Sequence, residues 1–206
     1  MCKNGLLLAF ALMFSTSLLS AQKTPGDSTS KSHFIGSSGF VLLNLIPQDN
    51  PPHFFQVNFG YWLTNKDVIT IEAKTWTYRY PIGIPYGDSR EAPEEVYPGK
   101  VRGVGIGLAY QRFLWKGLYS AVHASAWSQT YLNENNQKIQ NGFQLFTALR
   151  LGYHIKLFKN RFFVEPSFAG TFWPINTNVP EVFSKKEDNW PNYFLVEPGL
   201  HFGFKF

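Results

Sequence analysis

The last fourteen residues of the chain alternate between two chemically different sets. Read backwards from the C-terminus in steps of two, one set is Phe206, Phe204, Phe202, Leu200, Pro198, Val196 and Phe194. The residues between them, from Lys205 back to Tyr193, mix charged side chains with glycine. Successive side chains of a β-strand point to opposite faces of its sheet. The segment is therefore predicted to form a strand with one apolar face and one mixed face.

Eight strand candidates follow the first 33 residues. They are Phe34 to Ile46, His53 to Leu63, Val68 to Tyr80, Val101 to Leu114, Leu118 to Leu132, Phe143 to Leu157, Arg161 to Trp173 and Tyr193 to Phe206. Each covers the roughly 9 to 11 residues that a tilted strand needs to cross a bilayer. No apolar stretch among them is long enough for a membrane-spanning helix, because charged residues, glycine or proline interrupt each one.

The connections between these candidates alternate in length. The short ones are Thr64 to Asp67, Trp115 to Gly117 and Phe158 to Asn160, and the longer ones are Pro47 to Pro52, Pro81 to Lys100, Asn133 to Gly142 and Pro174 to Asn192. An up-and-down barrel with an even number of strands and both termini on one side of a membrane requires this alternation. The predicted fold class is all-β, an eight-stranded antiparallel up-and-down transmembrane β-barrel. The alternative is a soluble eight-stranded barrel such as a lipocalin, whose apolar face points inward.

The closing strand carries a resemblance. Its alternation and its final Phe206 resemble the last strand of Gram-negative outer-membrane β-barrels, and the chain resembles the small OmpA- and OmpX-like barrels in particular. The resemblance implies that Phe202, Phe204 and Phe206 form a C-terminal signal for the barrel-assembly machinery. It also implies a monomer surrounded by outer-membrane lipids. It names no extracellular ligand and no physiological role.

The N-terminus predicts export. Lys3 precedes an apolar run from Leu6 to Phe14 and small residues up to Ala21, the pattern of a signal peptide cleaved before Gln22. The predicted domains are a signal peptide over 1–21, a disordered periplasmic leader over 22–33 and an outer-membrane barrel over 34–206. Cys2 leaves with the signal peptide, so the mature chain offers neither a disulfide nor a thiolate metal site.

Charge argues against a nucleic-acid partner. Removing Lys3 from the 19 basic side chains leaves 18 against 14 acidic ones, a formal charge of +4. This excess is mild and dispersed, with no basic patch of the kind that nucleic-acid binding requires. No cofactor is expected.

The face of each strand that carries charge is predicted to line the lumen. Leu149 lies on the apolar face of its strand, whereas Ala148 and Arg150 share the opposite face. An arginine facing hydrocarbon is costly, so the opposite face must point inward. The same rule predicts a polar lumen cluster of Glu72, Lys74, Arg150, His154, Lys156, Glu165, Glu197, His201 and Lys205. We interpret it as an ion-paired plug, with a proton relay or a metal site as the alternatives.

Two further patterns concern packing. Gly103, Gly105 and Gly107 form a bare inward row, which leaves room for large neighbours such as Trp76 and Trp127. The segment from Phe162 to Pro166 repeats as Phe194 to Pro198, with glutamate inward and proline outward. Because proline removes a ladder donor, we expect two local kinks that help the wall to close.

One fragment is similar to an enzyme. His123-Ala124-Ser125 resembles the His-x-Ser pair of outer-membrane lipid A deacylases. That family also uses an acidic residue further along the chain, and here Glu134 could take this role. In that family the catalytic face looks outward, whereas the parity of this strand places His123 and Ser125 in the lumen. Nucleophile, base and orienting group must lie within hydrogen-bond reach of one another, and Glu134 belongs to a loop.

The function predicted from these patterns is that of a non-enzymatic outer-membrane barrel with a plugged lumen and a structural or surface-interaction role. The alternatives are a lipid A deacylase-like hydrolase that uses His123 and Ser125, and a narrow pore. Recognition is expected on the loops, where Trp190 is a candidate anchor.

Overall fold

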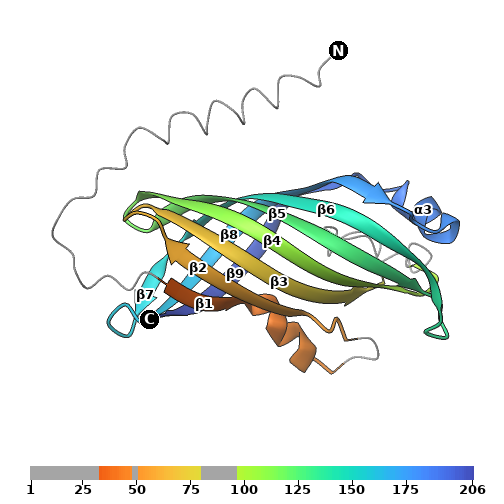
Figure 1. Ribbon diagram of the computed structural model, residues 1–206, viewed down its shortest axis with the longest axis horizontal. Coiled ribbons are helices and arrows are strands. Elements are labelled where there is room, and N and C mark those ends of the chain that lie inside the picture. The colour runs from red at the N-terminus through yellow and green to blue at the C-terminus, as the bar shows by residue number, and fades with distance from the viewer. Residues whose placement is uncertain (1–32, 48–50, 80–96) are drawn as a thin grey trace, which may run out of the picture. The chain divides into compact units, whose positions relative to one another are not determined.

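The computed structural model describes residues 33–47, 51–79 and 97–206 (Figure 1). Its elements are β1 His33–Ser38, η1 Gly39–Leu45, β2 Phe55–Trp62, β3 Asp67–Tyr78, β4 Lys100–Trp115, β5 Leu118–Leu132, β6 Lys138–Tyr153, β7 Ile155–Leu157, β8 Phe162–Thr177, α3 Glu181–Glu187 and β9 Tyr193–Lys205. The predicted signal peptide and residues 22–32 of the predicted leader lie outside the described residues. In the described part of the chain, no helix has the length and apolarity to cross a bilayer.

The strands close into a ring of antiparallel pairs. Each strand from β1 to β5 pairs with the next one, β6 and β7 both pair with β8, and β8 pairs with β9. Strand β9 then pairs with β1 through Ser38↔His201 to Phe34↔Lys205, which closes the ring. Because β6 and β7 are two parts of one strand, the wall is an eight-stranded up-and-down barrel. The predicted fold class is confirmed by this pairing.

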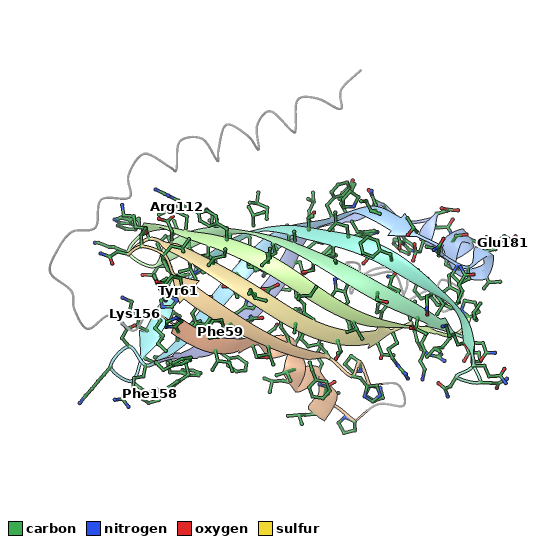
Figure 2. All side chains as sticks on the ribbon, viewed as in Figure 1. Phe59, Tyr61, Arg112, Lys156, Phe158 and Glu181 are labelled. Atoms are coloured by element: carbon green, nitrogen blue, oxygen red, sulfur yellow. The ribbon has the colours of Figure 1, made fainter. Side chains whose placement is uncertain are left out.

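The connections gather at two ends of the barrel. The turns that follow β2, β4 and β7 lie at one end, called here the turn end, together with the C-terminus (Figure 1). The longer connections and α3 lie at the opposite end, called here the loop end. Figure 2 shows Lys156 and Phe158 at the turn end and Glu181 at the loop end.

The interruption between β6 and β7 has a cause in the sequence. The bridges to β8 stop at Gly152↔Ser167 and resume at Ile155↔Val164, so no bridge forms opposite Pro166. Proline lacks the N–H that a central ladder needs. The first of the two predicted kinks is therefore a break in the ladder at His154.

The first strand is much shorter than predicted. The prediction of a strand from Phe34 to Ile46 is wrong beyond Ser38, where the chain turns into the 3₁₀ helix η1. The Ser38 side chain accepts a hydrogen bond from the Phe40 N–H at 3.3 Å and caps this helix. The Asn44 side-chain amide then donates to the Phe54 carbonyl at 2.6 Å and accepts from the Phe54 N–H at 2.9 Å. It thereby satisfies backbone groups that a neighbouring strand would otherwise pair. Local side-chain bonds of this kind compete with strand pairing.

Two predicted loops are shorter than expected. The connection between β5 and β6 covers only residues 133–137, because β6 begins at Lys138 and not at Phe143. Strand β8 continues to Thr177, past the predicted boundary at Pro174, and the loop after it contains α3. Most of the predicted loop from Pro81 to Lys100 lies outside the described residues.

The alternation of the closing strand breaks at a bulge. Ala169 pairs with Glu197 but Thr171 pairs with Phe194, so β9 carries one extra residue there. Leu195 and Val196 are both exposed, and Phe194 is half-buried. The predicted outward position of Phe194 is therefore wrong. A bulge of this kind shifts the side-chain parity of everything beyond it.

Exposure is inverted relative to a soluble barrel. Apolar side chains such as Ile106 (63% exposed), Leu149 (62%) and Phe168 (62%) cover the outer wall, where Figure 2 also labels Phe59 and Tyr61. The interior instead holds polar side chains, among them Glu72 (1% exposed) and Arg150 (7%). This distribution excludes the lipocalin-like alternative, whose apolar face would line the interior.

The inward glycines of β4 accommodate tryptophan. The six-membered part of the Trp127 ring lies against Gly103 and Gly105, where a Cβ would stand 2.9 and 2.7 Å from the nearest ring atoms. A side chain at either position would collide with a ring that is 4% exposed. The glycine row is thus a packing requirement of β4.

Candidate functional site in the barrel lumen

The lumen is filled at mid-height by ion pairs, called here the central network: Glu72, Lys74, His123, Arg150 and Glu197. Glu72 Oε2 lies 2.7 Å from the Lys74 ammonium, and Glu72 Oε1 lies 3.1 Å from Nδ1 of His123. Strands β3 and β5 place these groups, since alternate residues of each strand face inward. A carboxylate buried this deeply needs such partners, because an unpaired charge in a low-dielectric interior is costly.

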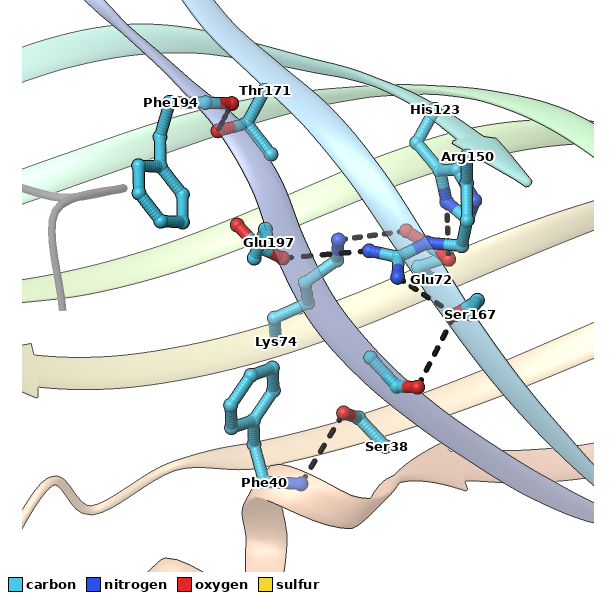
Figure 3. A network of polar contacts seen from close by, with 11 residues as sticks. Ser38, Phe40, Glu72, Lys74, His123, Arg150, Ser167, Thr171, Phe194 and Glu197 are labelled. Atoms are coloured by element: carbon cyan, nitrogen blue, oxygen red, sulfur yellow. Dashed lines mark hydrogen bonds and ion pairs between the residues drawn. The ribbon is translucent and has the colours of Figure 1, made fainter. Parts of the chain in front are cut away.

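Arg150 connects three neighbouring strands of the wall, β6, β8 and β9. Its guanidinium donates to Ser167 Oγ on β8 at 2.9 Å and to Glu197 Oε1 on β9 at 3.4 Å, and Ser167 in turn donates to the Gly199 carbonyl at 3.3 Å (Figure 3). The bonds therefore tie β6 to the closing strand. Removing the arginine would leave the carboxyl of Glu197 without its closest cationic partner.

A second group of bonds, called here the lower network, lies toward the turn end and consists of Gln111, His154, Glu165 and Lys205. Glu165 Oε1 accepts from Gln111 at 3.0 Å and lies 2.6 Å from Nδ1 of His154. The Lys205 ammonium lies 3.1 Å from the other ring nitrogen of His154 and 4.5 Å above the ring of Trp62. These contacts engage both ring nitrogens of His154, one with the Glu165 carboxylate and the other with the Lys205 ammonium.

The two remaining members of the predicted lumen cluster behave differently. His201 faces inward, and its ring stacks on His123 with centroids 6.4 Å apart, but its Nδ1 is buried without a hydrogen-bond partner. Lys156 is exposed on β7 and lies at the turn end (Figure 2). Lys156 pairs with the buried Phe163 and so keeps the predicted lumen-side parity. It is exposed because β7 lies beyond the break at His154, close to the end of the wall.

A small cavity separates the networks. It has a volume of about 30 Å³, and its lining includes Glu72, His123, Arg150, Glu165 and His201. A polar cavity of this size has room for one or two water molecules, but not for an organic substrate. It can hydrate the charged groups around it.

The loop end is closed by aromatic side chains, called here the mouth cluster. Its buried members are Tyr78, Tyr97, Val101, Tyr131, Trp173 and Phe183. Tyr97 comes from the connection before β4 and Phe183 from α3, so parts of two connections fold inward over the strands. Trp190 packs against the same cluster and is only half-buried by it.

Glu187 is half-buried against the mouth cluster and was not predicted. Its carboxylate accepts hydrogen bonds from the Tyr97 hydroxyl at 2.7 Å and from the Asn176 amide at 2.5 Å. Burial raises the pKa of Glu187 above its ordinary value, although these hydrogen bonds act in the opposite direction. Burial also holds the pKa of Tyr97 well above its ordinary value, so this hydroxyl stays protonated and donates. The sequence signal was the apolar Val182-Phe183 inside a charged loop.

The His-x-Ser pair has no catalytic geometry. His123 and Ser125 both face the lumen, where Nδ1 of His123 is engaged by Glu72 and Oγ of Ser125 is buried without a hydrogen-bond partner. Glu134 forms an ion pair with Arg79 at 2.6 Å on the rim of the loop end. The three residues therefore do not form a nucleophile, a base and an orienting acid in contact.

Metal ligands are not assembled in the described residues. No group of three or more histidine, cysteine, aspartate or glutamate side chains there is arranged to hold an ion. His123 and Glu72 together supply two such groups, but Lys74 already neutralises the carboxylate. In residues 33–47, 51–79 and 97–206, the charged lumen side chains are thus engaged in ion pairs and hydrogen bonds.

Comparisons with known proteins return structural likenesses only. No protein family profile matches the chain, and no curated protein matches it. The N-terminal β-barrel domain of OprF from Pseudomonas aeruginosa is similar in structure, with a TM-score of 0.42, 16% identity, and coverage of 86% of this chain and 98% of that chain. Neisserial surface protein A (NspA) has a TM-score of 0.41, 10% identity, and coverage of 85% and 94%. At these values neither likeness supports an inference about function.

Proposed function

We propose that this protein is an outer-membrane β-barrel with a structural or surface-interaction role, a plugged lumen and no catalytic activity. The observation that carries the proposal is the inverted exposure of the wall. Apolar side chains such as Ile106 and Leu149 face outward on a closed barrel, while the ion pairs lie inside. In water this surface would aggregate, whereas in a bilayer the paired strands satisfy one another's backbone groups within the ring and the apolar side chains meet acyl chains.

The proposal includes the orientation and the partners. The turn end, with the C-terminus, faces the periplasm, and the loop end faces the exterior, since barrels of this type keep short turns on the periplasmic side. Outer-membrane lipids surround a monomeric wall. Phe202, Phe204 and Phe206 serve as the C-terminal signal for the barrel-assembly machinery, and the signal peptide is cleaved near Ala21.

Surface interaction is assigned to the loop end. The connections there, including α3 with its exposed Lys185, stand on a rigid wall, which is the usual setting of binding loops. Among the described residues, the lumen cavity of about 30 Å³ has room only for water. The contacts of His123 and Ser125 described above speak against the lipid A deacylase alternative.

Heat modifiability in SDS tests this function. Protein recovered from outer membranes is expected to migrate differently before and after boiling, because a closed ring of hydrogen bonds resists SDS until it is heated. A matched sample that was never folded should migrate like the boiled form. Recovery from the soluble fraction, or identical migration before and after boiling, would contradict the proposal.

A further inference from the structure

The wall of the barrel has an unpaired seam between β9 and β2. Strand β1 bridges these two neighbours only as far as Ser38, which pairs with His201. On the β9 side, residues 193–200 have no β1 partner, and on the β2 side the β1 pairing ends at Asn58. The 3₁₀ helix η1 lies outside the wall along this seam (Figure 1).

Residues of this protein reduce the number of unpaired backbone groups on both edges of the seam. On β2, the Ser37 hydroxyl donates to the Gln56 carbonyl at 2.7 Å, and the Asn44 amide satisfies both backbone groups of Phe54. On β9, Pro198 has no N–H to leave unpaired, and proline is typical of strand edges. Unpaired backbone groups at membrane depth are costly. These bonds on β2 and the missing N–H on β9 therefore lower the cost of leaving the two edges without a strand between them.

The seam lies at the height of the apolar belt. On β2, Phe55 and Val57 beside it are 58% and 54% exposed, and on β9 Leu200 is 43% exposed. Helix η1 adds Leu42 and Leu45, which are 57% and 77% exposed. The apolar outer surface is therefore continuous across the opening.

One side chain plugs the seam from outside. Phe40, at the start of η1, is half-buried, and its ring contacts Phe54 edge to face with centroids 5.9 Å apart. Phe54 in turn contacts Trp76 inside the lumen at 5.8 Å. A line of aromatic rings thus leads from the lipid-facing surface to the lumen.

Lumen side chains beside the seam are partly exposed, to about the same degree as His123 (15%) on the fully paired strand β5. The side chains of Lys74 and Glu197 are 12% and 16% exposed, against 2% for Glu72. Trp76 is half-buried, whereas Trp127, which lies against the paired strands β4 and β5, is 4% exposed.

We propose that this seam is a lateral binding site for one acyl chain of a membrane lipid, with Phe40 as its stopper. The lipid's acyl chain lies between η1 and the free edge of β9, and the end of this acyl chain reaches the aromatic rings of Phe54 and Trp76. An acyl chain fits because both flanks are apolar, Ser37 and Asn44 bond backbone groups of the β2 edge, Pro198 on the β9 edge has no donor, and the surrounding apolar belt meets the same lipids. The site rests on the proposed location of the barrel in a membrane.

Quenching by brominated lipid tests the site. The refolded mature chain is placed in vesicles of phosphatidylcholine that is brominated in the middle of its acyl chains, with a single tryptophan retained as Trp76 or Trp127, or introduced as Ile106→Trp. Bromine quenches only a tryptophan that it contacts. We expect the largest loss of emission at position 106, the smallest at Trp127 and a clear loss at Trp76. Phe40→Ala should increase the loss at Trp76, and Leu149→Ala, an equally apolar truncation on a paired part of the wall, should not.

Each outcome separates the two proposals. If position 106 is quenched and Trp76 is as shielded as Trp127, with or without Phe40, the acyl-chain site is wrong and the barrel proposal stands. If position 106 is not quenched, the barrel is not in the bilayer and the proposed function fails. If Phe40→Ala loses its heat-modifiable migration, it is replaced by Phe40→Leu. We expect the leucine variant to increase the loss of Trp76 emission less than the alanine variant would. If the leucine variant causes no increase in this loss, the role of Phe40 as a stopper is contradicted.

Discussion

Single residues decide which face of the wall is lipid and which is lumen. Neighbouring positions on β6 have opposite requirements, since Leu149 is 62% exposed on the outer wall and Arg150 is 7% exposed within the central network. Because side chains alternate strictly along a strand, one substitution can test the whole assignment.

Leu149→Arg is expected to lower the free energy of unfolding in lipid by roughly 2 to 4 kcal/mol, the cost of an arginine at mid-membrane on a barrel surface. Ala148→Ser, on the inward face beside it, should change this free energy far less. Equilibrium unfolding of the refolded barrel in vesicles measures both. An arginine variant as stable as the parent would mean that inside and outside are exchanged.

Glu187 is expected to make the loop end sensitive to pH. Burial raises its pKa above the ordinary 4.5, so the folded mouth binds a proton more tightly than the unfolded loop. The stabilisation from the protonated carboxyl is therefore complete below the ordinary value and is lost as the pH rises through the raised one.

The Glu187→Gln variant should remove this dependence, since the amide stays neutral. Hydrogen exchange of residues 181–190, corrected for intrinsic rates, should show that the parent loses protection as the pH rises above about 4.5, whereas the variant keeps it. Equal pH profiles for the two proteins would contradict a role of Glu187 in closing the mouth.

Among the elements, β4 and β9 show how backbone and packing constrain each other. Strand β4 has glycine at Gly103 and Gly105, and the Trp127 ring lies against its backbone there. Strand β9 keeps its pairing with β8 despite the bulge at Leu195 and Val196, which lies within its free edge along the seam. Each strand is regular only where its neighbours leave room.

Gly105→Ala should destabilise the barrel, because the new Cβ would stand 2.7 Å from the Trp127 ring, which has nowhere to move. Overpacking of this kind costs about 1 to 3 kcal/mol. Gly170→Ala is the matched control, since its Cβ would meet only Leu195, at 3.8 Å. Comparable unfolding midpoints for the two variants would show that Trp127 is free to shift.

The whole barrel is arranged as a filled tube with three layers inside it. The lower network, the central network and the mouth cluster follow one another from the turn end to the loop end, and a cavity of about 30 Å³ adjoins the first two. An eight-stranded barrel has an interior only wide enough for its own side chains. Such a tube should conduct ions poorly.

Planar-bilayer recordings of the refolded barrel are expected to show at most small and irregular conductance. Truncating Trp76 and Arg150 to alanine together should raise it, because the two side chains fill the upper and central lumen. Ala148→Ser, which removes no volume, is the control. Large and steady ion-selective channels from the parent would contradict the plugged lumen and favour the pore alternative.

The architecture follows from the sequence because a barrel wall has a period of two. Alternation alone assigned Leu149 to the outside and Arg150 to the lumen, and the alternation of short and long connections predicted eight strands in order. These signals are local, so they need no knowledge of neighbouring strands. The same reasoning placed the glycines of β4 against Trp127.

Tertiary structure decided what depends on contacts between distant segments. The end of β1 at Ser38 could not be predicted, because it depends on Asn44 replacing a strand beside Phe54, ten residues further along the chain. The bulge in β9 and the exposure of Lys156 depend on the register of β8 and on the break at His154. Burial of Glu187 likewise arises from α3 folding onto Tyr97. A sequence states the period of a strand, but only the closed ring determines where that strand has a partner.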